Sequence, residues 1–232
     1  MRLAFWTPRP RVGWAGALTS LLVGEMRLVE ADPAVPPAVD LDVYDVADDP
    51  AHGFVYRALR REPGVVVLQD WNLHRLVHAE TAGGGDPAGY RREARRSRGE
   101  TGAFVAEQVL AGRGGALPCV LPLNDRVLEA SLGLVTTSPE VQARAEARLG
   151  GRPLVRLPSD PVAAALALLD LARAVHADGA RLRREVEADR GPKDSLVALA
   201  LDEVRPAVHE LSLPRVPSDI VRLLAELLPG GQ

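Results

Sequence analysis

Pro63-Gly64-Val65-Val66-Val67-Leu68 is the stretch of this chain that decides its fold. Three β-branched residues and a leucine follow a proline–glycine turn, and this pattern predicts a β-strand over Val65–Gln69. Because the run is apolar without alternation, we expect both faces of the strand to be covered, as in the centre of a parallel sheet. Five other runs predict further strands: Leu3–Thr7, Arg27–Glu30, Leu41–Val46, Leu134–Thr137 and Leu154–Leu157.

Amphipathic helical stretches separate these strands. Ser138-Pro139-Glu140 is a typical helix start, with a hydroxyl cap, a proline at the first helical position and an acid in the first turn. Alternating strands and helices indicate parallel strands joined by crossovers. We therefore expect an α/β fold with a doubly wound, Rossmann-like sheet over residues 1–158. The predicted helices are Trp14–Met26, His52–Glu62, Trp71–Thr81, Pro87–Ala111, Asp125–Leu132 and Pro139–Leu149.

The pattern becomes helical after Ser159-Asp160-Pro161 and remains so to residue 228. One helix runs from Val162 towards Val186, a second opens at Pro192, and a third follows Pro217. Three stripes of this length make a marginal core by themselves, because small domains bury too little surface. We therefore expect residues 159–232 to form C-terminal helices that pack back on the α/β domain.

Composition narrows the classes of function. The 232 residues are 47% hydrophobic and 25% charged, which is typical of a soluble globular protein, and the net charge of −3 argues against nucleic-acid binding. The single cysteine, Cys119, excludes an intrachain disulfide, and its apolar neighbours predict a buried, inert thiol. The longest apolar run, Val162–Leu169, is too short to span a bilayer, and no signal-peptide pattern is visible, so we expect a cytoplasmic protein.

Ligands of open parallel sheets bind beyond the carboxyl ends of the strands, near the topological switch point. The loop after the first strand carries Gly13 and Gly16, which allow close backbone approach to an anion at a helix N-terminus or simply make a tight turn. The aspartate-rich stretch Asp45–His52 ends at the same edge.

The central strand is followed directly by Gln69 and Asp70. Asp70 would accept a hydrogen bond from a substrate hydroxyl or cap the helix that follows. Thr137 and Ser138 follow a later strand, where their hydroxyls would meet a polar ligand, and capping explains Ser138 equally well. These four residues are the candidates for a polar site at this edge.

His74 and His78 are four residues apart, and Asp70 lies four residues earlier, so a helix would place all three on one face. That spacing permits a metal ion, but without a further ligand we predict no metal site. Five arginines lie on the helix predicted after Pro87, with Glu93 and Glu100 between them. This pattern favours a solvated face, and the alternative is a docking surface for anionic lipid or a phosphorylated acceptor. The five arginines are Arg91, Arg92, Arg95, Arg96 and Arg98.

Several of these segments together resemble the acceptor-side domain of family 4 glycosyltransferases of the GT-B fold. The resemblance covers residues 1–158 and is carried by His52–Asp70, Leu73–Val77, Leu121–Ala130 and Leu134–Ser138. The segment Leu201–Arg205 is similar to the closing helices of some such enzymes.

The resemblance implies site residues at matching positions. Gln69 stands where the family commonly has a histidine near the reacting sugar, Asp70 matches the aspartate that follows it, and His74 matches a histidine of similar enzymes. Glutamine does not titrate, so it cannot act as a general acid or base. The family's donor-binding domain has no counterpart here, so a nucleotide-sugar, if bound at all, would be a substrate; we expect no cofactor.

We consider three functions, two that follow from this resemblance and one from a different class. The first is a glycosyltransferase-like protein, a pseudoenzyme when alone, that binds a glycan acceptor or a partner. The second is an active or split glycosyltransferase that works with a separate donor-domain chain. The third is a non-catalytic scaffold that forms a homodimer. A large apolar tail surface would favour the third, and a polar crevice lined by Asp70, His74 and Ser138 would favour the first two.

Overall fold

The computed structural model describes residues 1–9, 13–22, 26–30, 33 and 37–189. The described residues divide into two compact units, residues 1–71 with 126–189 (unit 1) and residues 72–125 (unit 2). The second and third helices predicted for the tail, from Pro192 and Pro217, lie outside the described residues, so the domain boundary at residue 158 stays a prediction. None of the helices among the described residues is both long and apolar enough to cross a membrane.

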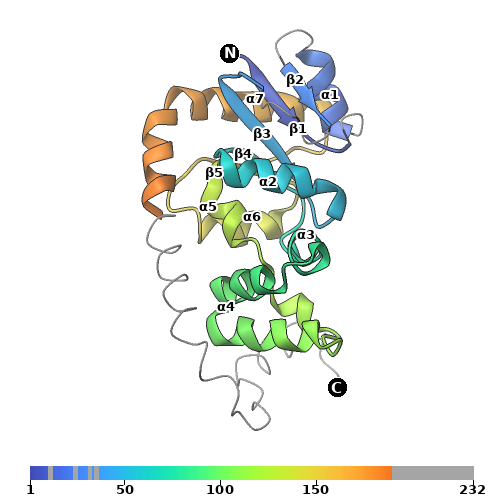
Figure 1. Ribbon diagram of the computed structural model, residues 1–232. Coiled ribbons are helices and arrows are strands. Elements are labelled where there is room, and N and C mark those ends of the chain that lie inside the picture. The colour runs from blue at the N-terminus through green and yellow to red at the C-terminus, as the bar shows by residue number, and fades with distance from the viewer. Residues whose placement is uncertain (10–12, 23–25, 31–32, 34–36, 190–232) are drawn as a thin grey trace, which may run out of the picture. The chain divides into compact units, whose positions relative to one another are not determined.

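Unit 1 contains a six-stranded, all-parallel sheet in the order β2-β1-β3-β4-β5-β6 (Figure 1). The α/β fold is thus confirmed, and β4 lies inside the sheet between β3 and β5 with every residue buried. The strands are β1 Leu3–Trp6, β2 Met26–Val29, β3 Leu41–Val46, β4 Gly64–Leu68, β5 Ser131–Thr136 and β6 Leu154–Arg156.

Helices cover both faces of this sheet. On one face α1 packs against α7, and the apolar core beneath them includes Phe5, Val43, Val65 and Val67. The helices α2 and α6 lie on the opposite face (Figure 1). The bounds are α1 Gly13–Leu21, α2 Gly53–Arg61, α5 Asp125–Ala130, α6 Pro139–Glu146 and α7 Pro161–Ala177.

The direction in which successive strands are added to the sheet reverses at β1. From β1 it crosses through α1 to β2 at the edge, and β3 then lies on the other side of β1. Right-handed crossovers that run in opposite directions place their helices on opposite faces, which explains why α1 and α2 face apart. The topological switch point of the sheet is therefore between β1 and β3.

The described start of the C-terminal region, residues 160–189, is part of unit 1. Asp160 accepts a hydrogen bond from the backbone N–H of Ala163 at 2.8 Å, and Pro161 opens α7. The predicted helical period ends at Asp178 with a turn, and helical residues 179–189 continue in another direction (Figure 1). Leu182 and Val186 of this second stretch belong to the same apolar core.

Unit 2 contains α3 His74–Glu80 and α4 Pro87–Leu110. The prediction of one long helix from Pro87 was wrong, because α4 breaks at Arg98 and Gly99, where Gly99 has φ +53°. The two halves run antiparallel (Figure 1), which brings Arg91 and Glu107 within 2.6 Å of each other. A Cβ on Gly102 would lie 1.8 Å from the carbonyl oxygen of Ala94, so this close approach requires glycine.

Gly133 on β5 lies where α7 packs closely against the sheet. A Cβ there would lie 2.8 Å from Cγ2 of Val175, so we expect Gly133→Ala to destabilise the protein by about 1–2 kcal/mol. Val175→Ala creates space and costs about 2 kcal/mol alone. In the double variant Gly133→Ala, Val175→Ala, the loss of unfolding free energy measured in urea should be about 0.5–1 kcal/mol smaller than the sum of the two single losses. The pair Gly133→Ala and Val55→Ala, with Val55 on α2, should be additive; equal coupling in both pairs would refute this packing.

Candidate functional site

A buried polar cluster occupies the switch point of the sheet. The register pairs Trp6 with Tyr44, so Thr7 directly follows β1 next to Asp45 of β3. The Thr7 hydroxyl donates to Oδ2 of Asp45 at 2.8 Å, and the Gln69 side-chain amide donates to Oδ1. Three neighbouring strands thus each contribute one side chain to this cluster, which centres on the Asp45 carboxylate.

Asp45 is almost fully buried, with 2% of its surface exposed. Burial raises the pKa of Asp45, and the hydrogen bonds from Gln69 and Thr7 act in the opposite direction. Its backbone carbonyl also contacts Nδ1 of the buried His52 at 2.7 Å. The sequence places Asp45 in a polar stretch but does not pair it with Thr7, because that pairing requires knowledge of the strand order.

The rim of this edge holds exposed polar groups. Arg9 and Asp49 form an ion pair at 2.5 Å, and the backbone N–H of Arg9 donates to the Thr7 hydroxyl at 3.1 Å. Thr137 is exposed, and its hydroxyl donates to the backbone carbonyl of Gln69 at 3.4 Å.

Asp70 does not cap α3. Its Oδ2 accepts a hydrogen bond from the backbone N–H of Asp48 at 2.9 Å, so the side chain braces the loop after β3. Asn72 takes the capping role, since its Oδ1 accepts from the backbone N–H of His74 at 2.8 Å. Because α3 begins at His74, Asp70 lies before the helix and does not share a helical face with His74 and His78.

Ser138 caps α6, accepting from the backbone N–H of Val141 at 3.2 Å, so its hydroxyl has a structural task. Gly13 begins α1 with φ +55°, which favours glycine, and the carbonyl of Gly16 accepts from the hydroxyls of Thr19 and Ser20 within α1. Residues 10–12 of the loop before them lie outside the described residues.

His74 belongs to unit 2, where it is 6% exposed and packed against aromatic rings. Its Nδ1 lies 3.3 Å from the carbonyl oxygen of Leu121, so Nδ1 carries the proton, and its Nε2 accepts from the Tyr90 hydroxyl at 3.0 Å. Burial lowers the pKa of His74; the hydrogen bond to Leu121 raises it, and the charge of His78 lowers it. Both ring nitrogens are therefore engaged inside the unit.

The structure also bears on three further predictions, for a metal site, the arginine cluster and Cys119. Within the described part of the chain, no group of three or more His, Cys, Asp or Glu side chains is placed to hold a metal ion. Arg91, Arg92 and Arg95 each pair with a carboxylate, which favours the solvated face over lipid docking. Cys119 is exposed, so the predicted burial of its thiol was wrong: it lies on a short 3₁₀ helix of which Val120 is the buried residue.

A buried arginine that the sequence pattern does not reveal supports the sheet. Arg152, 7% exposed, donates to the backbone carbonyls of Leu149, Leu128, Glu129 and Ser131. It thereby caps the end of α5 and the start of β5, and this role is structural.

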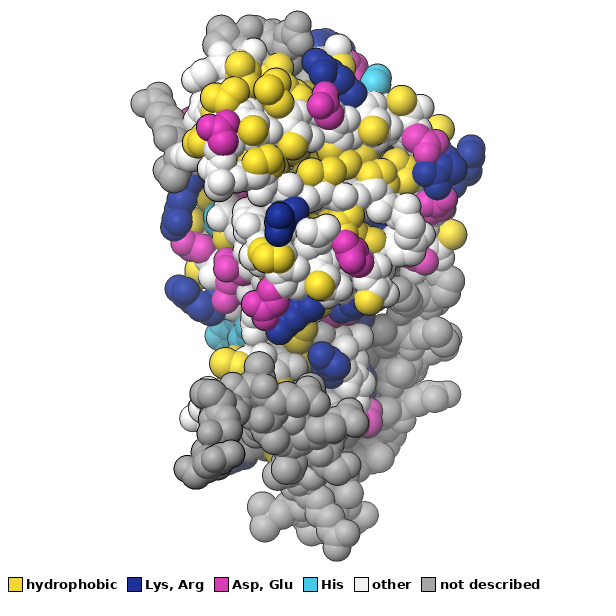
Figure 2. All heavy atoms as spheres, turned by 180° about the vertical axis from the view of Figure 1, so that it is seen from behind, with side chains coloured by type: hydrophobic (Ala, Val, Ile, Leu, Met, Phe, Trp, Pro, Cys, Tyr) yellow, Lys and Arg dark blue, Asp and Glu magenta, His cyan; other side chains and the backbone are white. Residues whose placement is uncertain are grey.

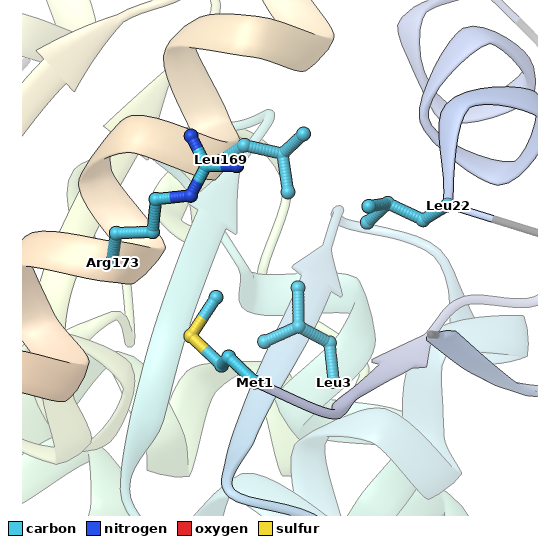
Figure 3. A pocket seen from close by; sticks show the side chains of 5 residues that line it. All are labelled: Met1, Leu3, Leu22, Leu169 and Arg173. Carbon is cyan, nitrogen blue, oxygen red and sulfur yellow. The ribbon is translucent and has the colours of Figure 1, made fainter. Parts of the chain in front are cut away.

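A small cavity of about 150 Å³ lies at the other end of β1. Four apolar side chains and Arg173 line it, and Figure 3 shows them: Met1, Leu3, Leu22, Leu169 and Arg173. It is too small for a sugar and offers one polar group, so it is not the ligand site of the switch point.

Comparison with known proteins finds no relative of this chain. No family model, curated protein or solved structure matches the sequence or the structure. The class of the protein is therefore that of an α/β protein with a Rossmann-like, six-stranded parallel sheet.

The raised pKa of Asp45 predicts a specific pH dependence. Above the ordinary value of 3.8 the unfolded chain releases this proton while the folded protein retains it, so wild-type stability falls as pH rises through the raised pKa. Asp45→Asn keeps an oxygen for Gln69 but cannot ionise. In urea unfolding, the free energy of unfolding of the variant should therefore rise relative to that of wild type, by about 1.4 kcal/mol for each pH unit between the ordinary and the raised pKa. The exposed Asp170→Asn should track wild type; a parallel Asp45→Asn curve would contradict the burial argument.

Tyr90→Phe should raise the pKa of His74 towards its ordinary value of 6.5. The hydroxyl that this substitution removes donates to Nε2 and so stabilises the neutral ring in the wild type. The variant should also lose about 1 kcal/mol of stability. Titration of the imidazole C–H signals by NMR measures both histidines of α3 together. Tyr56→Phe, in unit 1, is the matched control and should leave His74 unchanged. A lowered His74 pKa in Tyr90→Phe would disprove the assigned hydrogen bond.

Proposed function

We propose that unit 1 binds a hydroxyl-rich ligand of the glycan-acceptor class at the carboxyl edge of its sheet, and that the chain alone transfers no sugar. The observation that carries this proposal is the cluster of Thr7, Asp45 and Gln69 at the switch point, where open parallel sheets bind their ligands. Asp70 and Thr137 at the rim supply a carboxylate and a hydroxyl, which are suitable partners for sugar hydroxyls.

The resemblance of residues 1–158 to the acceptor side of family 4 glycosyltransferases supports this choice of ligand. In that family a histidine and an aspartate follow the central strand, and the histidine lies near the reacting sugar; Gln69 and Asp70 stand at these positions after β4. Asp70 already accepts one backbone hydrogen bond at Oδ2, which leaves Oδ1 as the acceptor for a ligand hydroxyl.

Two features support inactivity of the chain alone. The Gln69 amide has no titratable proton, and it already donates to Asp45, so it offers neither acid nor base. The transition state of sugar transfer gains most from charges around the departing diphosphate, and the resemblance covers no donor-binding segment that would supply them. A separate chain with a donor domain would complete the reaction, as in a split enzyme.

A second candidate is the oligomerising scaffold. Val162 and Leu166 on α7 are each 50% exposed, and Leu21 on α1 is 48% exposed. Figure 2 shows apolar side chains at the surface among charged ones of both signs. This surface favours self-association if the sheet edge binds no sugar.

The proposal is tested by turnover and binding. We expect the purified chain to release no nucleoside diphosphate from UDP-glucose or GDP-mannose above a protein-free blank. In a ¹H–¹⁵N NMR titration, methyl α-D-mannopyranoside should shift the side-chain amide of Gln69 and the backbone amide of Thr137. The Asp70→Ala variant should bind about tenfold more weakly, which corresponds to one lost charged hydrogen bond.

Ser138→Ala is the matched control: it should lose about 1 kcal/mol of stability with the helix cap and bind the sugar like wild type. Diphosphate release that disappears in Asp70→Ala would show an active enzyme and refute the inactivity. No amide shift with sugar would refute the binding and leave the scaffold as the better interpretation.

A further inference from the structure

A larger cavity, of about 390 Å³, lies on the α2 side of the sheet, away from the switch-point cluster. Trp6 comes to it from β1, Asp42 and Tyr44 come from β3, and Ala58 and Glu62 come from the last turn and end of α2. Its volume falls within the range of about 300–1,000 Å³ that small-molecule sites occupy. No residue of the proposed sugar site lines it.

One of the two carboxylate oxygens of Asp42 remains available as a hydrogen-bond acceptor in this cavity. The Trp6 indole N–H donates to Oδ1 of Asp42 at 2.7 Å, and no group among the described residues donates to Oδ2. Burial raises the pKa of Asp42, the indole hydrogen bond lowers it, the charge of Glu62 raises it further, and Arg183 lowers it. A cation that binds next to a partly buried carboxylate with a raised pKa stabilises its charged form.

The other charges that face the cavity have partners. Asp40 accepts from the backbone N–H of Arg2 at 2.7 Å, and Glu62 pairs with Arg183 at 3.2 Å. Arg61 also lines the cavity and has its own interactions. The charge of Asp42 is therefore the one available to a ligand.

The remaining walls are apolar or aromatic. Pro37, Ala38 and Val39 form one side. The rings of Trp6 and Tyr44, whose centroids are 5.8 Å apart, also line the cavity, and the Tyr44 hydroxyl donates to the carbonyl of Glu62 at 2.9 Å. A cation near such rings is attracted to them and would pair with the carboxylate of Asp42, which would repel an anion.

We propose that this cavity binds a small organic ammonium ion, whose N–H group donates to Oδ2 of Asp42 while its hydrocarbon part packs against Pro37 and Val39. Carboxylate, aromatic floor and apolar wall together match the charged head and the apolar body of such an amine. The site is separate from the sugar site, so either can exist without the other.

Binding of 2-phenylethylamine, compared with the uncharged 2-phenylethanol of similar shape, tests this proposal. The indole N–H signal of Trp6 is the readout and is assigned by its loss in Trp6→Phe. We expect the amine to shift this signal and to bind at least about tenfold more tightly than the alcohol, because only the amine pairs with the carboxylate.

Asp42→Asn keeps Oδ1 for the indole and removes the charge, so it should weaken amine binding about tenfold and leave alcohol binding unchanged. Asp40→Asn is the matched control in the same cavity and should change amine binding less than about twofold, since Arg2 already engages that carboxylate. Unfolding curves check that each variant is folded. Equal binding of amine and alcohol, an unaffected Asp42→Asn, an equal loss in Asp40→Asn, or no Trp6 shift with excess amine would each overturn the proposal.

Discussion

Burial of β4 on both faces is the constraint on which the rest of unit 1 depends. Val65 and Val67 face the core under α1 and α7, so Val66 and Leu68 face the opposite layer. An apolar strand of this kind is stable only with helices on both sides, and parallel neighbours require crossovers that supply those helices. The same strand therefore fixes the layering of the sheet and the position of Gln69 at its end.

The polar cluster is a consequence of that layering. Because the crossovers run in opposite directions from β1, the ends of β1 and β3 are neighbours at the switch point of the sheet. Thr7 and Asp45 come together there by register, and Gln69 reaches them from β4. The buried carboxylate is tolerated since two side chains donate to it, and burial is compensated in part by those hydrogen bonds.

The strands could be predicted well from the sequence and the polar contacts poorly, for physical reasons. Five of the predicted strands begin within a residue of the observed ones, and for β1, β3 and β4 the reason is burial, which imposes a local apolar pattern. The sixth, β5, begins at Ser131 and not Leu134, since α5 ends directly into it. The helical pattern shows no interruption at Gly99, so periodicity alone could not show that α4 is a helical hairpin. His74 meets Tyr90, 16 residues away, and Leu121, 47 residues away, and no local pattern could predict that these two contacts engage both of its ring nitrogens. By contrast, the Ser138 cap spans three residues and was correctly among the predicted alternatives.

The two aspartates of β3 show why burial alone does not define a ligand site. Asp45 is the more deeply buried, but both of its oxygens accept hydrogen bonds from the protein, so it orders the edge rather than receiving a ligand directly. Asp42 is less buried and has one protein donor among the described residues, so part of its hydrogen-bonding capacity remains open towards a cavity. In both cases burial raises the carboxyl pKa, and the number of unfilled acceptor positions decides which carboxylate gains from binding another molecule.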